Sequence, residues 1–162
     1  MLKKSFPPII PKYSKVLILG SLPGDRSIAE NQYYAHPQNR FWKILVALFN
    51  KPLPTDYRSK VNILHIEGIA LWDVCQTAHR VGSMDTDILK EIPNPIHQLL
   101  QEHPSITTVC FNGQKAEKLY DKYFDRQDSL HYIVLPSSSP ANANFTQERL
   151  LEKWKVIKDA VG

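Results

Sequence analysis

The sequence predicts an α/β protein with a mostly parallel central sheet, and two features of the chain lead to this class. Short continuous apolar runs, such as residues 15–20 and 131–135, are typical of strands buried on both faces of a sheet. Segments with helical spacing lie between these runs. An alternation of strands and helices along the chain favours parallel strand pairing.

The elements can be placed in order along the chain. Residues 6–11 are rich in proline and are expected to belong to an extended N-terminal arm over residues 1–13. The run 15–20 is expected to be a strand that ends at Gly20. A helix is expected over residues 40–49, where apolar side chains share one face: Phe41, Ile44, Leu45 and Leu48.

The second half continues the alternation. Gly68 separates two further apolar segments, 63–66 and 69–74. Helices are expected over 95–102, 114–123 and 146–160, the last capped by Thr146, and strands over 107–111 and 131–135. No internal repeat, linker or low-complexity tract is visible, so we expect one domain over residues 1–162.

Composition excludes several classes of protein. The chain has 162 residues, 43% of them hydrophobic, and a net charge of +4, which suits a globular domain that meets a phosphate backbone. Cys75 and Cys110 are too few for a disulfide framework and are expected to be buried thiols in a reducing compartment. No signal sequence, membrane span or metal spacing of histidines is apparent. We therefore expect a cytoplasmic protein without a cofactor.

Three expected strands end in unusual loops, and these loops indicate the site. The first is the glycine loop, residues 20–24; the second is Asn112-Gly113; the third lies at 136–142. The carboxyl ends of parallel strands share one edge of the sheet, where ligands of α/β proteins bind. We therefore expect the three loops to converge on one site.

Each motif also has a plain structural interpretation. The glycine loop brings the backbone close to a ligand or is an ordinary turn; it lacks the G-x-G-x-x-G pattern and the helix-hairpin-helix spacing. In the aromatic segment, residues 32–43, Asn39 presents an amide or caps a helix, and His36 is catalytic or shapes a turn. The hydroxyls after residue 136 contact phosphates or form a surface turn.

The chain resembles the uracil-DNA glycosylase superfamily. Residues 35–43, Ala-His-Pro-Gln-Asn-Arg-Phe-Trp-Lys, resemble a segment of the mismatch-specific uracil/thymine-DNA glycosylases. The glycine loop, Gln32 to Trp42, Gly68 to Val74, Phe111 to Gly113 and Leu135 to Asn142 are similar, in order and spacing, to the hypoxanthine-DNA (deoxyinosine) glycosylase branch. The resemblance extends over residues 14–160.

The resemblance implies a three-layer α/β/α sandwich around a four-stranded parallel sheet, and an enzyme that flips a deaminated base out of double-stranded DNA. Tyr34 would stack on the base, and Gly20, Ser21, Leu22 and Asn112 would surround it. The DNA contacts would come from Pro23, Gly24, Ser137, Ser138, Ser139, Pro140, Ala141 and Asn142, with Ser137 on a phosphate and 138–142 in the minor groove.

The chain departs from the wider superfamily at one position, and this departure changes which residue we expect to be catalytic. The third position of the glycine loop, which carries Asp or Asn in related enzymes, is Leu22 here and cannot hold a water molecule. The resemblance to the hypoxanthine-DNA glycosylase branch implies that Asn39 takes over this role. We expect the Asn39 carbonyl oxygen to orient the attacking water, with the backbone N–H of Ser21 and a helix start stabilising the departing base.

The sequence leaves alternatives open. No lysine falls within these motifs, and Lys43 lies on the following helix, so we expect a monofunctional, monomeric enzyme that leaves an abasic site in base excision repair. The preferred base is expected to be hypoxanthine; the alternatives are uracil, mismatched thymine, or a catalytically weak protein that binds damaged DNA. Residues 79–85 resemble a loop of the branch and either face DNA or form a surface turn.

Overall fold

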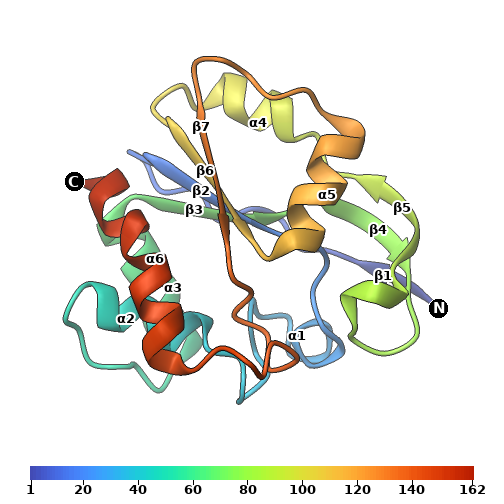
Figure 1. The fold of residues 1–162 in the computed structure, drawn as a ribbon, viewed down its shortest axis with the longest axis horizontal. Coiled ribbons are helices and arrows are strands. Elements are labelled where there is room, and N and C mark those ends of the chain that lie inside the picture. Colours follow the sequence, from blue (N-terminus) through green and yellow to red (C-terminus); the bar gives the residue numbers. More distant parts are fainter.

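A parallel four-stranded sheet forms the centre of the computed structural model, which describes residues 1–162 (Figure 1). Its strands are β2 (Val16–Gly20), β3 (Ile69–Asp73), β6 (Thr108–Asn112) and β7 (His131–Leu135), in the order β3-β2-β6-β7. All three neighbouring pairs are parallel. Strands β2, β3 and β6 are buried over their whole length, which explains their continuous apolar runs.

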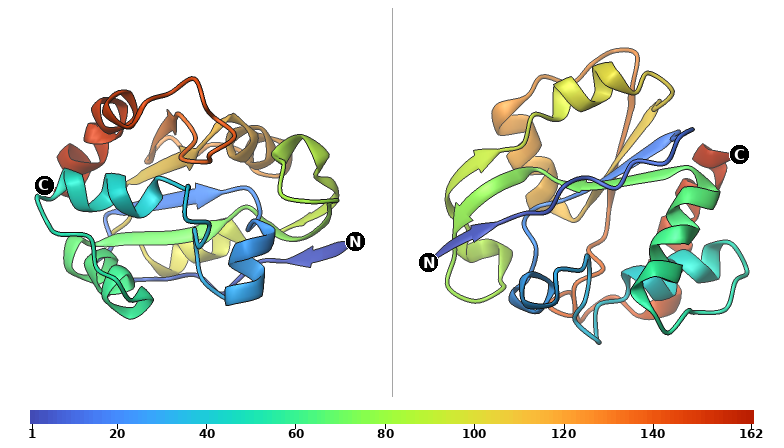
Figure 2. Two further views of the ribbon diagram at one scale, coloured as in Figure 1. Left: turned by 90° about the horizontal axis from the view of Figure 1, so that it is seen from below. Right: turned by 180° about the vertical axis from the view of Figure 1, so that it is seen from behind.

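Helices cover both faces of this sheet and form the two outer layers (Figures 1 and 2). One layer contains α2 (Phe41–Leu48), α3 (Tyr57–Glu67) and α6 (Gln147–Val161); the other contains α4 (Ile96–Glu102) and α5 (Gln114–Tyr123). Side chains of β2 alternate between two cores: Val16 and Ile18 pack in the first, Leu17 and Leu19 in the second. The expected three-layer α/β/α fold is confirmed.

Element bounds agree closely with those expected from the sequence, with one shift that matters for the site. Helix α5 and strand β7 have the expected bounds, and residues 63–66 lie inside α3. Helix α2 begins at Phe41 with Arg40 as its N-cap, so Asn39 is not in the capping position that the sequence suggested. Asn39 lies one residue earlier, in the turn that leads into α2.

A second, smaller sheet was not expected from the sequence. Strands β1 (Leu2–Lys4), β4 (Cys75–His79) and β5 (Leu89–Pro93) pair antiparallel in the order β1-β4-β5. Part of the extended N-terminal arm thus adds a strand to β4, and Ile9 further along forms a bridge with Leu71. The helices α1 (Asp25–Glu30) and η1 (Asp85–Asp87) are also additions to the expected elements.

The two cysteines are both free and buried, as expected. Burial raises the pKa of each thiol to about 12, so both are neutral and unreactive at ordinary pH. None of the helices combines the length and the apolar character needed to cross a membrane.

Candidate active site

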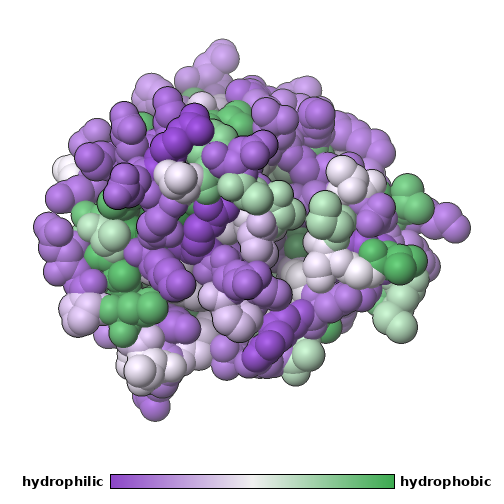
Figure 3. Space-filling model, turned by 60° about the horizontal axis from the view of Figure 1, so that its bottom comes forward, coloured by the Kyte–Doolittle hydropathy of each residue, from purple (hydrophilic) through white to green (hydrophobic).

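The three loops converge on a cavity of about 740 Å³ at the carboxyl ends of the strands. Figure 2 (left) views the molecule from this end, and Figure 3 shows that the face is mostly hydrophilic or of intermediate hydropathy. A cavity of this size is typical of small-molecule sites and has room for a nucleobase. Every site residue expected from the sequence lines it: Gly20, Ser21, Leu22, Pro23, Gly24, Tyr34, Asn39, Asn112 and Ser137 to Asn142.

Ser138 is the centre of a buried hydrogen-bond network that joins two of the loops to the aromatic segment. Its hydroxyl accepts a hydrogen bond from Asn112 Nδ2 at 3.0 Å and donates to Asn39 Oδ1 at 2.9 Å. Its backbone N–H donates to Asn112 Oδ1 at 2.9 Å. The side chain of Ser138 has no solvent exposure, and the network fixes β6, β7 and the start of α2 relative to one another.

This network engages two side chains that the sequence expected to contact the substrate. Ser138 was expected to contact DNA in the minor groove; its side chain is fully buried at the edge of the cavity. Asn112 was expected to present its amide to the base edge. Its Nδ2 instead donates to both Tyr34 Oη (3.1 Å) and Ser138, so neither amide hydrogen is free for a ligand.

Asn39 turns the chain into α2 and also faces the cavity. Its Oδ1 accepts a hydrogen bond from the Phe41 backbone N–H at 3.0 Å. A backbone N–H only donates, so this bond places the amide oxygen, and not the nitrogen, toward the helix. With the Ser138 hydroxyl also donating, Oδ1 already accepts two hydrogen bonds, whereas no hydrogen bond within the protein engages Nδ2.

Tyr34 is held rigidly beside the cavity. Its ring stacks on Phe41 with centroids 4.2 Å apart and planes 14° apart, which leaves the opposite face of the ring as the one a base can meet. Its backbone has φ of 54°, a left-handed conformation that non-glycine residues rarely adopt. Burial and the nearby Asp73 raise the pKa of Tyr34, so the phenol is neutral.

The glycine loop supplies an apolar wall and little free polar chemistry. Leu22 is 6% exposed and packs in the core between the sheet and the α4/α5 layer, while lining the cavity. The Ser21 hydroxyl donates to Asp85 Oδ1 at 2.6 Å and is therefore occupied. The loop can thus contact a base through the Leu22 side chain and its backbone.

Asp73 is a cavity residue that sequence reasoning missed. It ends β3, is 4% exposed, and pairs in register with Gly20 of β2. A Cβ on Gly20 would lie 2.5 Å from Asp73 Oδ1, so only glycine leaves room for this carboxyl. An acidic residue that ends a fully buried strand at the ligand-binding edge was the signal that could have identified it.

Arg40 is a second residue whose role was missed. Its guanidinium donates to the backbone carbonyls of Ser139 and Asn142, both at 3.0 Å, and also to that of Phe145. Its own backbone N–H donates to the Ser138 carbonyl at 3.1 Å. The N-cap residue of α2 therefore holds the serine loop, residues 136–145, in place.

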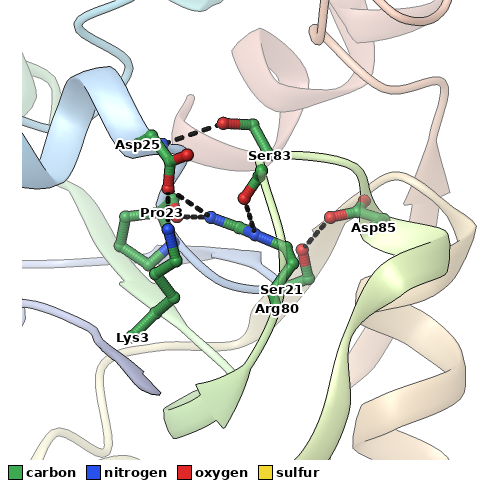
Figure 4. A network of polar contacts seen from close by, with 8 residues as sticks. Lys3, Ser21, Pro23, Asp25, Arg80, Ser83 and Asp85 are labelled. Atoms are coloured by element: carbon green, nitrogen blue, oxygen red, sulfur yellow. Dashed lines mark hydrogen bonds and ion pairs between the residues drawn. The ribbon is translucent and has the colours of Figure 1, made fainter. Parts of the chain in front are cut away.

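Arg80 has a similar role for the glycine loop (Figure 4). Its side chain is fully buried, and its guanidinium donates to the carbonyls of Pro23 at 2.5 Å and Gly82 at 2.6 Å. Asp25 forms a salt bridge with Lys3, and its backbone N–H donates a hydrogen bond to the Ser83 hydroxyl oxygen at 2.9 Å. The loop after β4, to which the sequence assigned no definite role, thus packs against the glycine loop and lines the cavity through Ser83 to Thr86.

Two further residues are placed by the structure. The Nδ1 atom of His36 accepts a hydrogen bond from the Gln38 backbone N–H at 3.1 Å, which is the turn-shaping role that the sequence allowed. Lys153 of α6 is exposed and lines the cavity, although no lysine was expected there. No three His, Cys, Asp or Glu side chains lie together in a way that would hold a metal ion.

Comparisons with known proteins show the family of this chain. The family model described as the uracil DNA glycosylase superfamily matches residues 7–161. A hypoxanthine DNA glycosylase of Methanosarcina acetivorans is 37% identical over 97% of this chain and 98% of its own length. One from Methanosarcina barkeri is 38% identical over 92% of this chain and 94% of its own.

A solved structure shares the fold of this chain. A solution NMR structure of a Methanosarcina acetivorans protein, assigned as a uracil DNA glycosylase, superposes with a TM-score of 0.83 at 35% identity. The match covers 100% of both chains. The chain therefore belongs to the uracil DNA glycosylase superfamily.

Proposed function

We propose that this protein is a hypoxanthine DNA glycosylase, which hydrolyses the C1′–N9 bond of a deoxyinosine nucleotide flipped out of double-stranded DNA. The observation that carries this proposal is the cavity of about 740 Å³, which is lined by the Tyr34 ring, the Leu22 side chain and several polar groups and is large enough for a purine. The names of the two similar Methanosarcina proteins support the choice of base.

The base enters between the glycine loop and Tyr34. One face of the Tyr34 ring is covered by Phe41, so the base stacks on the other face, an interaction that contributes roughly 1–3 kcal/mol. Leu22 packs against the base, with Gly20 and Ser21 beside it. A flipped base loses its stacking in the duplex, at a cost of a few kcal/mol that is smallest for a mispaired deaminated base.

Asn39 orients the water that attacks C1′. The water donates a hydrogen bond to Oδ1, and this requires the Ser138 hydroxyl to turn away from that oxygen when the nucleotide binds. A neutral amide is a weak base, so Asn39 contributes by positioning the water. Most of the rate enhancement must come from stabilising the departing base.

The start of α5 faces the departing base. Gly113 is the N-cap of α5, no side chain caps the helix, and Gly113 and Gln114 line the cavity. The first N–H groups of a helix carry partial positive charge and stabilise anions. Together with the Ser21 backbone N–H, they reduce the energy of the base as it takes up negative charge.

The DNA duplex is held by the two loops at the rim of the cavity. Ser137 and Ser139 are half-buried, and we assign them to phosphate contacts and to the groove, together with Pro140, Ala141 and Asn142. Pro23 and Gly24 contact the DNA from the opposite side. The enzyme acts as a cytoplasmic monomer in this proposal.

The enzyme leaves an intact abasic site. Lys43 is exposed and does not line the cavity, and Lys153, which does, is exposed on α6 where a flanking phosphate is its partner. Borohydride in the presence of inosine-containing duplex should therefore trap no covalent adduct. A trapped adduct that disappears in Lys153→Gln would show a Schiff base and a lyase activity.

A substrate panel tests the proposed function. Single-turnover base release is measured on duplexes that carry hypoxanthine, uracil, xanthine or a G·T mismatch, with an undamaged duplex as control. We expect release of hypoxanthine to be at least about tenfold faster than release of any other base. Faster release of uracil or thymine would reject the choice of base, and lesion binding without release from any duplex would reject an enzymatic function.

A further inference from the structure

We propose that Asp73 is a catalytic residue that donates a proton to the departing purine. This inference rests on the proposed function, because it concerns the release of a purine from the same cavity. It assigns the leaving-group step to a side chain that the sequence did not single out and that lies outside the three loops of the site.

Asp73 is built into the floor of the cavity by the sheet itself. The parallel register of β2 and β3 pairs Gly20 with Asp73, and the backbone N–H of Val74 donates to the Gly20 carbonyl at 2.8 Å. The carboxyl fills the space where a side chain at position 20 would lie, with Tyr34 Oη also close to that position. Two strands and a rigid tyrosine therefore fix the carboxyl beside the bound base.

The carboxyl group of Asp73 has no partner within the protein. Its Oδ2 atom is fully buried and makes no hydrogen bond. Burying a carboxyl that receives no hydrogen bond destabilises the folded state, and buried polar atoms in proteins are normally hydrogen-bonded. The other carboxylate that lines this part of the cavity, Asp85, does have a donor, the hydroxyl of Ser21. Asp73 is thus the acid in this cavity that has no hydrogen-bond partner within the protein, and its carboxyl is available to a ligand.

The surroundings of Asp73 favour its neutral, proton-bearing form. Burial is the largest cause, and the negative charge of Asp85 adds to it, so the pKa of Asp73 is raised to about 7. Arg80 is the one nearby cation that opposes this shift. Its Nε and Nη2 atoms donate to the Gly82 and Pro23 carbonyls, and its buried Nη1 atom makes no hydrogen bond, to Asp73 or to any other group. The other titratable neighbours, Tyr33, Tyr34 and Cys75, have raised pKa values and are neutral.

The proposed step balances as follows. The C1′–N9 bond breaks and its electron pair passes to the purine, while the Asp73 proton moves to N3 or N7 of the ring. The oxygen of the water held at Asn39 forms a bond to C1′, and the proton that it loses restores the acid on Asp73 through solvent. A purine anion is a poor leaving group, so protonation by a positioned acid removes a large part of the barrier, typically 10²–10⁴-fold.

The first test is the pH dependence of single-turnover hypoxanthine release. In the wild-type protein the rate should fall about tenfold between pH 6 and pH 8, as Asp73 loses its proton. Asp73→Asn keeps the shape of the side chain but cannot transfer a proton, so it should be about 100-fold slower at pH 6 and show no such decline. Asp87→Asn, an exposed change in the same region, is the matched control and should behave as the wild type.

Wild-type rates on two modified substrates give a test that does not depend on a folded variant. Carbon replaces N7 in one purine and N3 in the other. On the analogue that lacks the accepting nitrogen, the decline in rate with pH should disappear. Persistence of the decline on both analogues, or an Asp73→Asn rate equal to wild type, would overturn the proposal. A wild-type protein that releases no hypoxanthine would instead reject the proposed function.

Discussion

The carbonyl oxygen of Asn39 accepts two hydrogen bonds in the structure, from the Phe41 N–H and the Ser138 hydroxyl. An amide oxygen has two lone pairs, so a catalytic water must replace one of these donors. The Phe41 N–H belongs to the first turn of α2 and cannot leave without unwinding it. The Ser138 hydroxyl can rotate, which makes it the donor that gives way to water.

Two variants of Asn39 test whether its side-chain oxygen is needed for catalysis. Asn39→Ala removes the oxygen and should lower single-turnover release at least about tenfold, or about 1.4 kcal/mol. Asn39→Asp keeps an oxygen in the same place, so it should retain at least about tenfold more activity than Asn39→Ala. Asn62→Asp, an exposed change on α3, controls for the added charge. Equal rates in Asn39→Asp and Asn39→Ala would show that the oxygen does not hold the water.

At the scale of elements, each of the two DNA-facing loops is fastened by one arginine. Arg40 binds three carbonyls of the serine loop, and Arg80 binds the Pro23 carbonyl of the glycine loop. A guanidinium presents several donors in a fixed plane and can satisfy divergent acceptors at once. These contacts keep the backbone of each loop in one conformation.

Replacing Arg40 by lysine should loosen the serine loop without unfolding the protein. An ammonium on a flexible stem cannot reach all three carbonyls, and each hydrogen bond to a charged group is worth about 1.5–3 kcal/mol. We expect affinity for an inosine-containing duplex, measured by fluorescence anisotropy, to fall about tenfold, and amide exchange in residues 137–145 to become faster. Arg58→Lys on α3 is the control. Unchanged affinity together with unchanged exchange would contradict this role for Arg40.

The elements differ in how clearly the sequence indicated them. Strands β2 and β6 were predictable because strands buried on both faces need continuous apolar runs. Strand β4 was missed because Gln76 and His79 are exposed between buried positions, and β1 contains only three residues. Strand β5 has exposed Leu89 and Ile92, so its apolar residues do not mark a buried face. The second sheet depends on tertiary pairing, which local patterns do not encode.

At the scale of the whole molecule, the sequence indicated where the site lies but not how its groups are paired. The meeting of the glycine loop, Asn112 and the serine loop follows from parallel strands that end at one edge. The burial of Ser138 and the missing partner of Asp73 depend on contacts between residues far apart in the chain. Such pairings decide which polar groups are free for a ligand, and only the three-dimensional arrangement shows them.

A buried, unpartnered acid also affects the stability of the whole molecule. The ordinary pKa of an aspartate is 3.8, and burial raises that of Asp73 to about 7 in the folded state. Between these values the folded state binds the proton more tightly than the unfolded state. The stabilising contribution of the protonated group is complete below about pH 4 and is lost as the pH rises through about 7.

Asp73→Asn removes this titration, so its free energy of unfolding, relative to wild type, should increase from pH 5 to pH 8. The expected change is on the order of 1–4 kcal/mol, measured by urea unfolding at both pH values. Asp56→Asn is a suitable control. The pKa of Asp56 is lowered by its hydrogen bonds to Ser59, so it titrates below this window and its variant should differ from wild type equally at pH 5 and pH 8. A pH-independent difference for Asp73→Asn would mean that the carboxyl ionises freely in the folded protein, and the acid needed for the proposed proton transfer would then be absent at neutral pH.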